Sequence, residues 1–320
     1  MAHRFINQLK ENDSISEVYQ ITEKILRPNK NGNLYLQFTM TDRTGSLSGR
    51  LWNATEDFFL SFSENDFLLC EGAIQRFQGN LQFIAKKLTK TGASTVNLDD
   101  YARSVRLDLP VMIGRLREIL KGIQNPDLLN LADCFLADEN FMDLFCRMPA
   151  GIKLHHAYEG GLLEHTLSVM ELALKTAAIY GSRLNRDLLL IGAFLHDTGK
   201  VRELSLSGGM IYTDEGQMLG HPLLALEILL EKIRETEKLT GETFDSETAM
   251  LLKHLLISHH GTLENGSTKL PMTLEALVLF YLDSLDAKLA EFEKRMLEDP
   301  SAGSKWTNYI PVIERKLYKG

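Results

Sequence analysis

Residues 194–200 read Phe-Leu-His-Asp-Thr-Gly-Lys, and other histidines and acidic residues flank the pair His196-Asp197 at helical spacings. Eight of the nine histidines lie between His155 and His260. A metal site needs imidazoles and carboxylates gathered around one point, whereas a chance distribution would spread the histidines over the whole chain. The crowding therefore predicts a metal site in this part of the chain.

The sequence around this stretch has a helical period. Apolar residues recur at steps of three and four, and this pattern predicts helices over residues 109–122, 126–136, 139–148, 162–180, 186–195, 222–233, 246–259 and 273–296. Residues 204–220, rich in glycine, interrupt the pattern as a hairpin or flap would. The second domain is therefore predicted to be an all-helical bundle.

The predicted ligands fall on five different helices. A lone buried histidine is usually a core residue, but one ligand from each of several facing helices is how bundles build metal sites. We expect two metal ions with Asp197 between them. The first would be held by His165, His196, Asp197 and Asp283, and the second by His221, His259 and His260. This nitrogen and oxygen set suits Mn, Fe, Co, Ni or Zn.

Two such cations, about 3.5 to 4 Å apart, can hold a hydroxide and stabilise an in-line phosphoryl displacement. Lys200 lies four residues after His196, so a continuing helix would present both on one face, where Lys200 could neutralise charge on the phosphate. The alternative is a solvated lysine at a helix end. Asp286, three residues after Asp283, is expected to orient a ligand. Asp197 and Lys200 are thus the predicted catalytic residues.

Residues 13–90 alternate apolar and polar side chains in short runs, with turn signals at 31–33, 44–46 and 78–80. The pattern predicts five strands with one helix, near residues 55–62, between the third and the fourth. Such an arrangement is typical of a small Greek-key barrel.

Residues 15–90 resemble the nucleic-acid-binding OB-fold of the anticodon-binding type, through the segment 34–51, the turn Asp42-Arg43-Thr44-Gly45 and the closing Trp52. Such barrels stack bases on exposed aromatic side chains and follow phosphates with basic ones. The alternative is that the aromatic residues fill the barrel. The candidates are Tyr35, Phe38, Trp52, Phe77 and Phe83, with Arg50, Arg76, Lys86 and Lys87.

The helical half resembles the HD superfamily of metal-dependent phosphohydrolases. The motif 155–166, His-His-Ala-Tyr-Glu-Gly-Gly-Leu-Leu-Glu-His-Thr, together with 196–200, Gly220-His221-Pro222 and 258–261, is similar to the YhaM family of 3′-to-5′ exoribonucleases. That family couples an OB-fold to an HD domain in the order found here. The resemblance implies hydrolysis of single-stranded RNA to nucleoside monophosphates, with single-stranded DNA as a further candidate, and Mn²⁺ as the activating ion.

Three residues outside the ligand set are candidates for substrate contact. His155 and His156 precede the helix of His165, where they would touch phosphate or order the loop, and Tyr212 on the expected flap would stack on the terminal base or pack. His254 is interpreted as structural.

The chain is therefore predicted to be a multidomain α+β protein: an OB-fold barrel over 1–92, a helical linker packing on the bundle over 93–150, an HD domain over 151–300 and a tail over 301–320.

Residues 1–105 carry 12 basic and 12 acidic residues, so the whole net charge of −8 falls on the rest. An acidic half favours cation binding over bare phosphate binding. The three cysteines show no disulfide or metal spacing, and no signal or membrane segment is evident, so we expect a cytoplasmic protein without a membrane partner.

Three other functions compete with the exoribonuclease. HD enzymes also hydrolyse nucleotides, which would not require a barrel. Cyclic-dinucleotide phosphodiesterases share the multiple histidines, but the Gly-Tyr-Pro element of that group is absent here. A single-strand-binding protein with a structural metal site is the third alternative. The sequence leaves open whether the chain forms a homo-oligomer.

Overall fold

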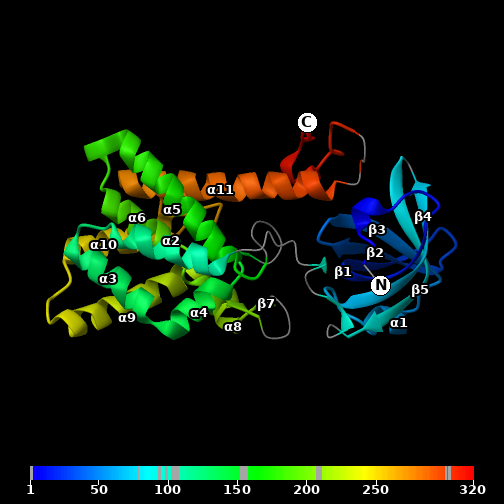
Figure 1. The fold of residues 1–320 in the computed structure, drawn as a ribbon, viewed down its shortest axis with the longest axis horizontal. Helices are drawn as coiled ribbons and strands as arrows, with labels where there is room; N and C mark the ends of the chain where they lie inside the picture. Colours follow the sequence, from blue (N-terminus) through cyan, green and yellow to red (C-terminus); the bar gives the residue numbers. More distant parts are fainter. Residues whose placement is uncertain are drawn as a thin grey trace. The chain divides into compact units, whose positions relative to one another are not determined.

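The computed structural model describes residues 3–77, 79–92, 95–97, 100–101, 108–151, 158–206, 211–299, 301 and 304–320. The chain divides into two compact units, one formed by Met1–Val105 with Phe292–Gly320 and the other by Arg106–Glu291. The first contains a barrel and the second a helical bundle (Figure 1).

Five strands close into a barrel in the order β1-β2-β3-β5-β4. They are β1 (Ser14–Pro28), β2 (Leu34–Asp42), β3 (Gly45–Trp52), β4 (Phe67–Phe77) and β5 (Asn80–Thr91). The β3–β5 pair is parallel and the other pairs are antiparallel. Helix α1 (Glu56–Leu60) lies between β3 and β4 in the chain, so the predicted five-stranded OB-fold with one inserted helix is confirmed.

Alternate side chains of each strand fill the barrel, as the period of two requires. On β2 these are Leu36, Phe38 and Met40, each at most 1% exposed, and on β5 Phe83 is fully buried. The candidates Phe38 and Phe83 therefore cannot stack on a base, because a barrel of this size needs bulky residues in its interior. Gly49 makes room for the Phe38 ring, since a Cβ at that position would lie 2.4 Å from it.

Ten helices of the described chain follow the barrel. The longer ones are α2 (Leu109–Lys121), α3 (Pro126–Ala137), α4 (Glu139–Arg147), α5 (Gly161–Tyr180), α6 (Arg186–Leu195), α9 (His221–Thr240), α10 (Ser246–Ser258) and α11 (Leu274–Glu298). These eight match the predicted helices. The short helices α7 (Lys200–Glu203) and α8 (Asp214–Leu219) were missed, because each is too short to show a period.

Local sequence signals start several of these helices. Asp108, Asn125, Asp138, Asn185 and Asp245 each accept a hydrogen bond from a backbone amide in the first turn of the helix that follows. One continuous apolar core then runs from α2 to α11 and includes Leu116, Phe135, Phe194 and Leu255. The helices α2 to α4, expected to pack on the bundle, share this core.

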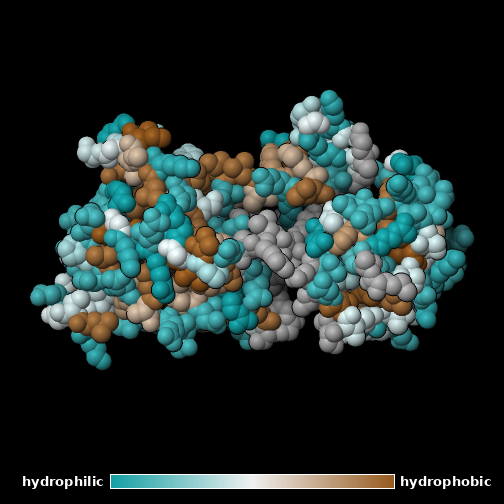
Figure 2. Space-filling model, in the orientation of Figure 1, coloured by the Kyte–Doolittle hydropathy of each residue, from teal (hydrophilic) through white to brown (hydrophobic). Residues whose placement is uncertain are grey.

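The described helices include none that is long and apolar enough to cross a membrane. Helix α11 nevertheless carries partly exposed apolar side chains along one face, among them Leu277, Tyr281 and Leu285. Figure 2 shows apolar surface over this helix. After α11 the tail folds back on itself. The backbone of Trp306 pairs with that of Tyr318 in an antiparallel β-bridge, and Asp299 forms an ion pair with Lys319.

Candidate metal centre

Five helices bring histidines and aspartates to one place in the bundle. His165 lies in the second turn of α5, His196 caps the end of α6 with Asp197 after it, and His221 is the first residue of α9. His259 caps the end of α10, and Asp283 lies on α11. Helix ends supply most of these ligands, because the chain there can turn a side chain toward the axis of the bundle.

One group of ligands surrounds Oδ2 of Asp197. This oxygen lies 3.5 Å from Nε2 of His165 and 3.5 Å from Nε2 of His196. Asp283 places Oδ1 3.2 Å from the same His165 nitrogen and 3.9 Å from that of His196. The predicted first metal set is thus gathered around one point.

A second group surrounds the other oxygen of the same carboxylate. Asp197 Oδ1 lies 3.3 Å from Nε2 of His221 and 3.9 Å from Nε2 of His259. Nε2 of His221 is also 3.1 Å from Nε2 of His260. Asp197 therefore offers one oxygen to each group, which is the arrangement of a carboxylate that bridges two ions.

The imidazoles are oriented by hydrogen bonds at their other ring nitrogen. Nδ1 of His165 pairs with Asp286 at 2.7 Å, and Nδ1 of His221 pairs with Glu203 at 3.1 Å. A carboxylate at Nδ1 keeps the proton there and leaves the Nε2 lone pair for a metal. Asp286 occupies the orienting position expected for it.

Two further histidines are oriented through the same ring nitrogen, Nδ1, by backbone carbonyls. Nδ1 of His196 donates to the Ala193 carbonyl at 2.8 Å, and Nδ1 of His259 donates to the Leu256 carbonyl at 2.7 Å. Nε2 of His259 is buried, and none of the described residues gives it a hydrogen-bond partner. A buried imidazole lone pair aimed at a carboxylate oxygen is the geometry of a metal ligand, so the residues present fit a divalent metal centre.

Burial sets the charge of these imidazoles. It lowers the pKa of His259 and His260, with the neighbouring histidines adding to the effect, so both are neutral at pH 7 and able to bind metal. Burial alone would lower the pKa of His165 as well. Hydrogen bonds to Asp283 and Asp286 outweigh it and raise the pKa of His165 to about 9.

Lys200 contacts the bridging carboxylate directly. Its Nζ lies 2.7 Å from Asp197 Oδ2 and also donates to the Ala150 carbonyl, and only 7% of the residue is exposed. The expected continuous helix from His196 to Lys200 is wrong, because α6 ends at Leu195 and α7 begins at Lys200. The turn between the two helices brings the ammonium to the carboxylate.

Glu203 and Gly199 were missed in the sequence. Glu203 accepts from both the backbone amide and Nδ1 of His221, and only its place seven residues after His196 hinted at a role. A Cβ on Gly199 would lie 2.0 Å from the His221 carbonyl oxygen and 2.6 Å from the Ala225 nitrogen. Only glycine permits this close approach of α7 and α9, and no periodic pattern reveals it.

Three substrate candidates of the helical half remain, together with His254, interpreted from the sequence as structural. His155 and His156 are outside the described residues. Tyr212 is half-exposed on β7 (Ile211–Tyr212), which pairs with β6 (Leu204–Ser205) as the hairpin that was expected. His254 accepts a hydrogen bond from the Met272 amide at 2.9 Å, a structural contact.

The barrel gathers four of its candidates on one face, where the Tyr35 and Trp52 rings are 5.2 Å apart. The Arg50 guanidinium lies 5.7 Å from each of these rings and 5.3 Å from that of Phe77. Trp52 and Phe77 are 44% and 50% exposed, and Arg50 Nε has no hydrogen-bond partner among the described residues. A cation with exposed aromatic rings is a surface suited to stacking bases. Lys86 is exposed on β5.

Five imidazoles and two aspartates, among them the adjacent pair His196 and Asp197, lie together in a helical bundle. This arrangement defines an HD-type hydrolase domain whose residues fit a divalent metal centre. Family models agree: the one described as HD domain matches residues 162–288, and the one described as OB-fold nucleic acid binding domain matches residues 17–91. A third, described as a putative helicase, matches residues 116–185.

Curated relatives match nearly the whole chain. The 3′-5′ exoribonuclease YhaM of Bacillus subtilis (strain 168) is 31% identical over 292 residues, covering 90% of this chain and 89% of the relative. The protein of the same name from Geobacillus sp. (strain WCH70) is 33% identical over 293 residues, with 90% and 86% covered. That from Listeria monocytogenes serotype 4b (strain CLIP80459) is 31% identical over 290 residues, with 90% and 89% covered. The chain belongs to the YhaM family.

Replacing Gly199 by alanine is expected to push the start of α9, and His221 with it, away from Asp197. The second group of ligands should then bind its ion at least about tenfold more weakly, at a stability loss of about 1 to 3 kcal/mol. Mn²⁺ binding by calorimetry and chemical denaturation measure both. Gly114→Ala is the control, because a Cβ there meets nothing within 4 Å. Unchanged binding in Gly199→Ala would show that the close approach does not hold His221.

The raised pKa of His165 predicts a pH-dependent metal affinity. Below pH 9 the imidazole carries a proton that the metal must displace, so affinity should rise about tenfold per pH unit between pH 6.5 and 8.5. Mn²⁺ titrations followed by the electron paramagnetic resonance of the free ion test this. Asp286→Asn should lower the pKa of His165 and flatten the upper part of the profile. An affinity independent of pH would contradict the prediction.

Proposed function

We propose that this protein is a metal-dependent exoribonuclease that shortens single-stranded RNA from its 3′ end and releases nucleoside 5′-monophosphates. The observation that carries the proposal is the Asp197 carboxylate, which presents one oxygen to each of two histidine groups. A carboxylate shared in this way holds two divalent cations, and a cation pair is the means by which many nucleases and phosphatases displace a phosphoryl group in line.

The reaction needs a nucleophile from water and a charge balance at the phosphate. When bound, the divalent cations supply both by acidifying water and by acting as Lewis acids, and Mn²⁺ is our choice among the ions that suit this ligand set. Water loses a proton as its oxygen bonds to phosphorus, the bond to the 3′ oxygen of the penultimate nucleotide breaks, and that oxygen takes up a proton and leaves as a hydroxyl. His165 and His196 keep their places through hydrogen bonds to Asp286 and to the Ala193 carbonyl, so little reorganisation is needed.

Lys200 is proposed to balance the charge of Asp197 and to face the phosphate as negative charge develops there. Its ammonium is already desolvated against the carboxylate, and a buried cation acts more strongly on a neighbouring anion than a solvated one. A solvated lysine at a helix end would not have this effect.

The barrel is proposed to retain the strand while the helical unit cuts it. Tyr35, Trp52 and Phe77 would stack on bases, with Arg50 between them and Lys86 on a phosphate. Two linked binding surfaces raise the local concentration of the polymer at the active site, which an acidic catalytic unit by itself would not achieve. Single-stranded DNA also offers unpaired bases that can stack and is proposed as a second substrate.

The alternatives account for less of the molecule. A nucleotide phosphohydrolase or a cyclic-dinucleotide phosphodiesterase would leave the aromatic face of the barrel without a role. A structural metal site would need a closed ligand set, whereas this centre borders a cavity.

We also propose that the protein is located in the cytoplasm. The three cysteines are buried free thiols, which supports a reducing compartment.

A 5′-labelled single-stranded RNA, incubated with metal-free protein resupplied with Mn²⁺, should shorten progressively from its 3′ end. Asp197→Ala should slow this at least about 100-fold, because both ions lose their shared ligand. The control is Asp133→Ala, an exposed aspartate of α3. Intact RNA that is shifted in a gel would favour a binding protein, and intact, unbound RNA would favour nucleotide substrates.

Trp52→Ala should weaken binding of single-stranded RNA by about 5- to 100-fold, the range expected for losing one stacked base. Mn²⁺-dependent hydrolysis of bis(p-nitrophenyl) phosphate, which has no nucleotide chain for the barrel to retain, should not change. Tyr180→Ala removes a similarly exposed aromatic ring from α5 and should affect neither measurement. Equal RNA affinity of Trp52→Ala and wild type would exclude this face from binding.

A further inference from the structure

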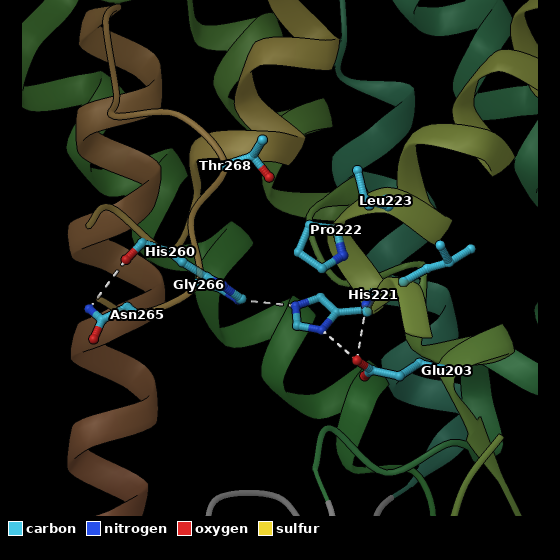
Figure 3. Close-up of a pocket in the computed structure, with 10 residues that line it drawn as sticks. Glu203, His221, Pro222, Leu223, His260, Asn265, Gly266 and Thr268 are labelled. Atoms are coloured by element: carbon cyan, nitrogen blue, oxygen red, sulfur yellow. Dashed lines mark hydrogen bonds and ion pairs between the residues drawn. The ribbon is translucent and has the colours of Figure 1, made fainter. Parts of the chain in front are cut away.

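A cavity of about 230 Å³ borders the second group of metal ligands. His221, His260 and Glu203 are among the residues that line it, and two segments far apart in the sequence face each other across it (Figure 3). One segment is the start of α9 with the two residues before it, and the other is the loop that follows α10. The volume lies below the ~300 Å³ at which pockets for drug-sized ligands begin, so the cavity suits a ligand no larger than a single nucleoside.

The α9 side of the cavity is apolar. Leu219, Pro222 and Leu223 line it, and the two leucines are 40% and 38% exposed. Exposed apolar side chains of this kind gain free energy when an apolar ring face covers them.

The opposite side offers a hydroxyl. Thr268 points across the cavity toward Pro222 (Figure 3). The loop that carries it is tied to the end of α10, since the backbone amides of Thr268 and Lys269 both donate to the Ile257 carbonyl. The Thr268 side chain is exposed, and its hydroxyl can donate or accept. This wall is therefore held in place before any ligand arrives.

Charge decides which part of a nucleotide fits. Among the described residues, those that line the cavity include no lysine or arginine, and the Glu203 carboxylate is one of them. A phosphate would be repelled by this carboxylate, whereas cations bound around Asp197 would attract it. An uncharged ring against the leucines, with its polar edge toward Thr268, meets no such penalty.

We propose that this cavity binds the base and ribose of the 3′-terminal nucleotide, with Leu223 packing on the ring and Thr268 hydrogen-bonding its edge. The inference rests on the proposed function and adds the position of the chain end. A terminal nucleoside in a cavity of this size, with its 5′ phosphate at the metal centre, places the bond to the penultimate nucleotide where it is cut. The cavity thereby selects chain ends over internal positions.

The test is a binding measurement that does not depend on RNA cleavage. Full-length protein loaded with Mn²⁺ is titrated calorimetrically with AMP, UMP and ribose 5-phosphate. Wild type should bind the two nucleotides at least about tenfold more tightly than ribose 5-phosphate, which lacks a base. Thr268→Val keeps the side-chain shape and should reduce this difference about 3- to 10-fold for at least one nucleotide. Leu223→Ala should reduce it for both.

Two controls match these variants. Thr243→Val alters an exposed threonine between α9 and α10, and Leu239→Ala alters an exposed leucine farther along α9. Both should behave as wild type.

The outcomes separate this proposal from the exonuclease function. Equal affinity of wild type for the nucleotides and ribose 5-phosphate would overturn the cavity's role, even if RNA is shortened. An equal loss for all three ligands in both variants would also overturn it, since it would indicate a general disturbance of the centre. A base-dependent difference that Thr268→Val and Leu223→Ala diminish would support the cavity, even if RNA stayed intact.

Discussion

The catalytic half depends on the interaction of the buried Asp197 carboxylate with the Lys200 ammonium and the surrounding histidines. This carboxylate is almost fully buried, and burial alone would raise its pKa, yet the Lys200 ammonium and the surrounding histidines hold that pKa well below its usual range. An ionised carboxylate in a dry interior is stable only beside cations. The same charge that draws Lys200 inward also makes Asp197 a ligand able to serve two metal ions. The need to neutralise one buried anion thus couples the folding of the bundle to its metal chemistry.

The position of His221 beside Asp197 depends on close backbone packing at two glycines. Gly199 allows α7 and α9 to pack closely, so that His221 lies beside Asp197. Gly216 allows α8 to pack against the backbone of Glu203, which orients the same histidine. These contacts connect a carboxylate, an imidazole and two short helices into one unit. Their glycines are required by space rather than by turn geometry, because neither has a positive φ.

In the function that we propose, the two units divide the work according to their charge and surface. Residues 1–105 are balanced in charge and present aromatic rings around Arg50, whereas the rest of the chain carries the net charge of −8 and includes the buried carboxylates of the metal centre. Polymer retention and phosphate chemistry make opposite electrostatic demands, since one needs exposed stacking surfaces and basic groups and the other needs buried carboxylates. Placing them on separate folds satisfies both.

The sequence by itself determined the order of the two folds, the eight longer helices, the five strands and the set of residues around the His-Asp pair, because periodicity and residue type are local properties. It did not distinguish Phe38 and Phe83, which fill the barrel, from Trp52 and Phe77, which lie on its surface. Only the tertiary structure decided the contact of Lys200 through a turn, the orienting role of Glu203 and the cavity beside His221. Each of these depends on distances between segments far apart in the chain, and such distances are set by helix packing rather than by spacing along the sequence.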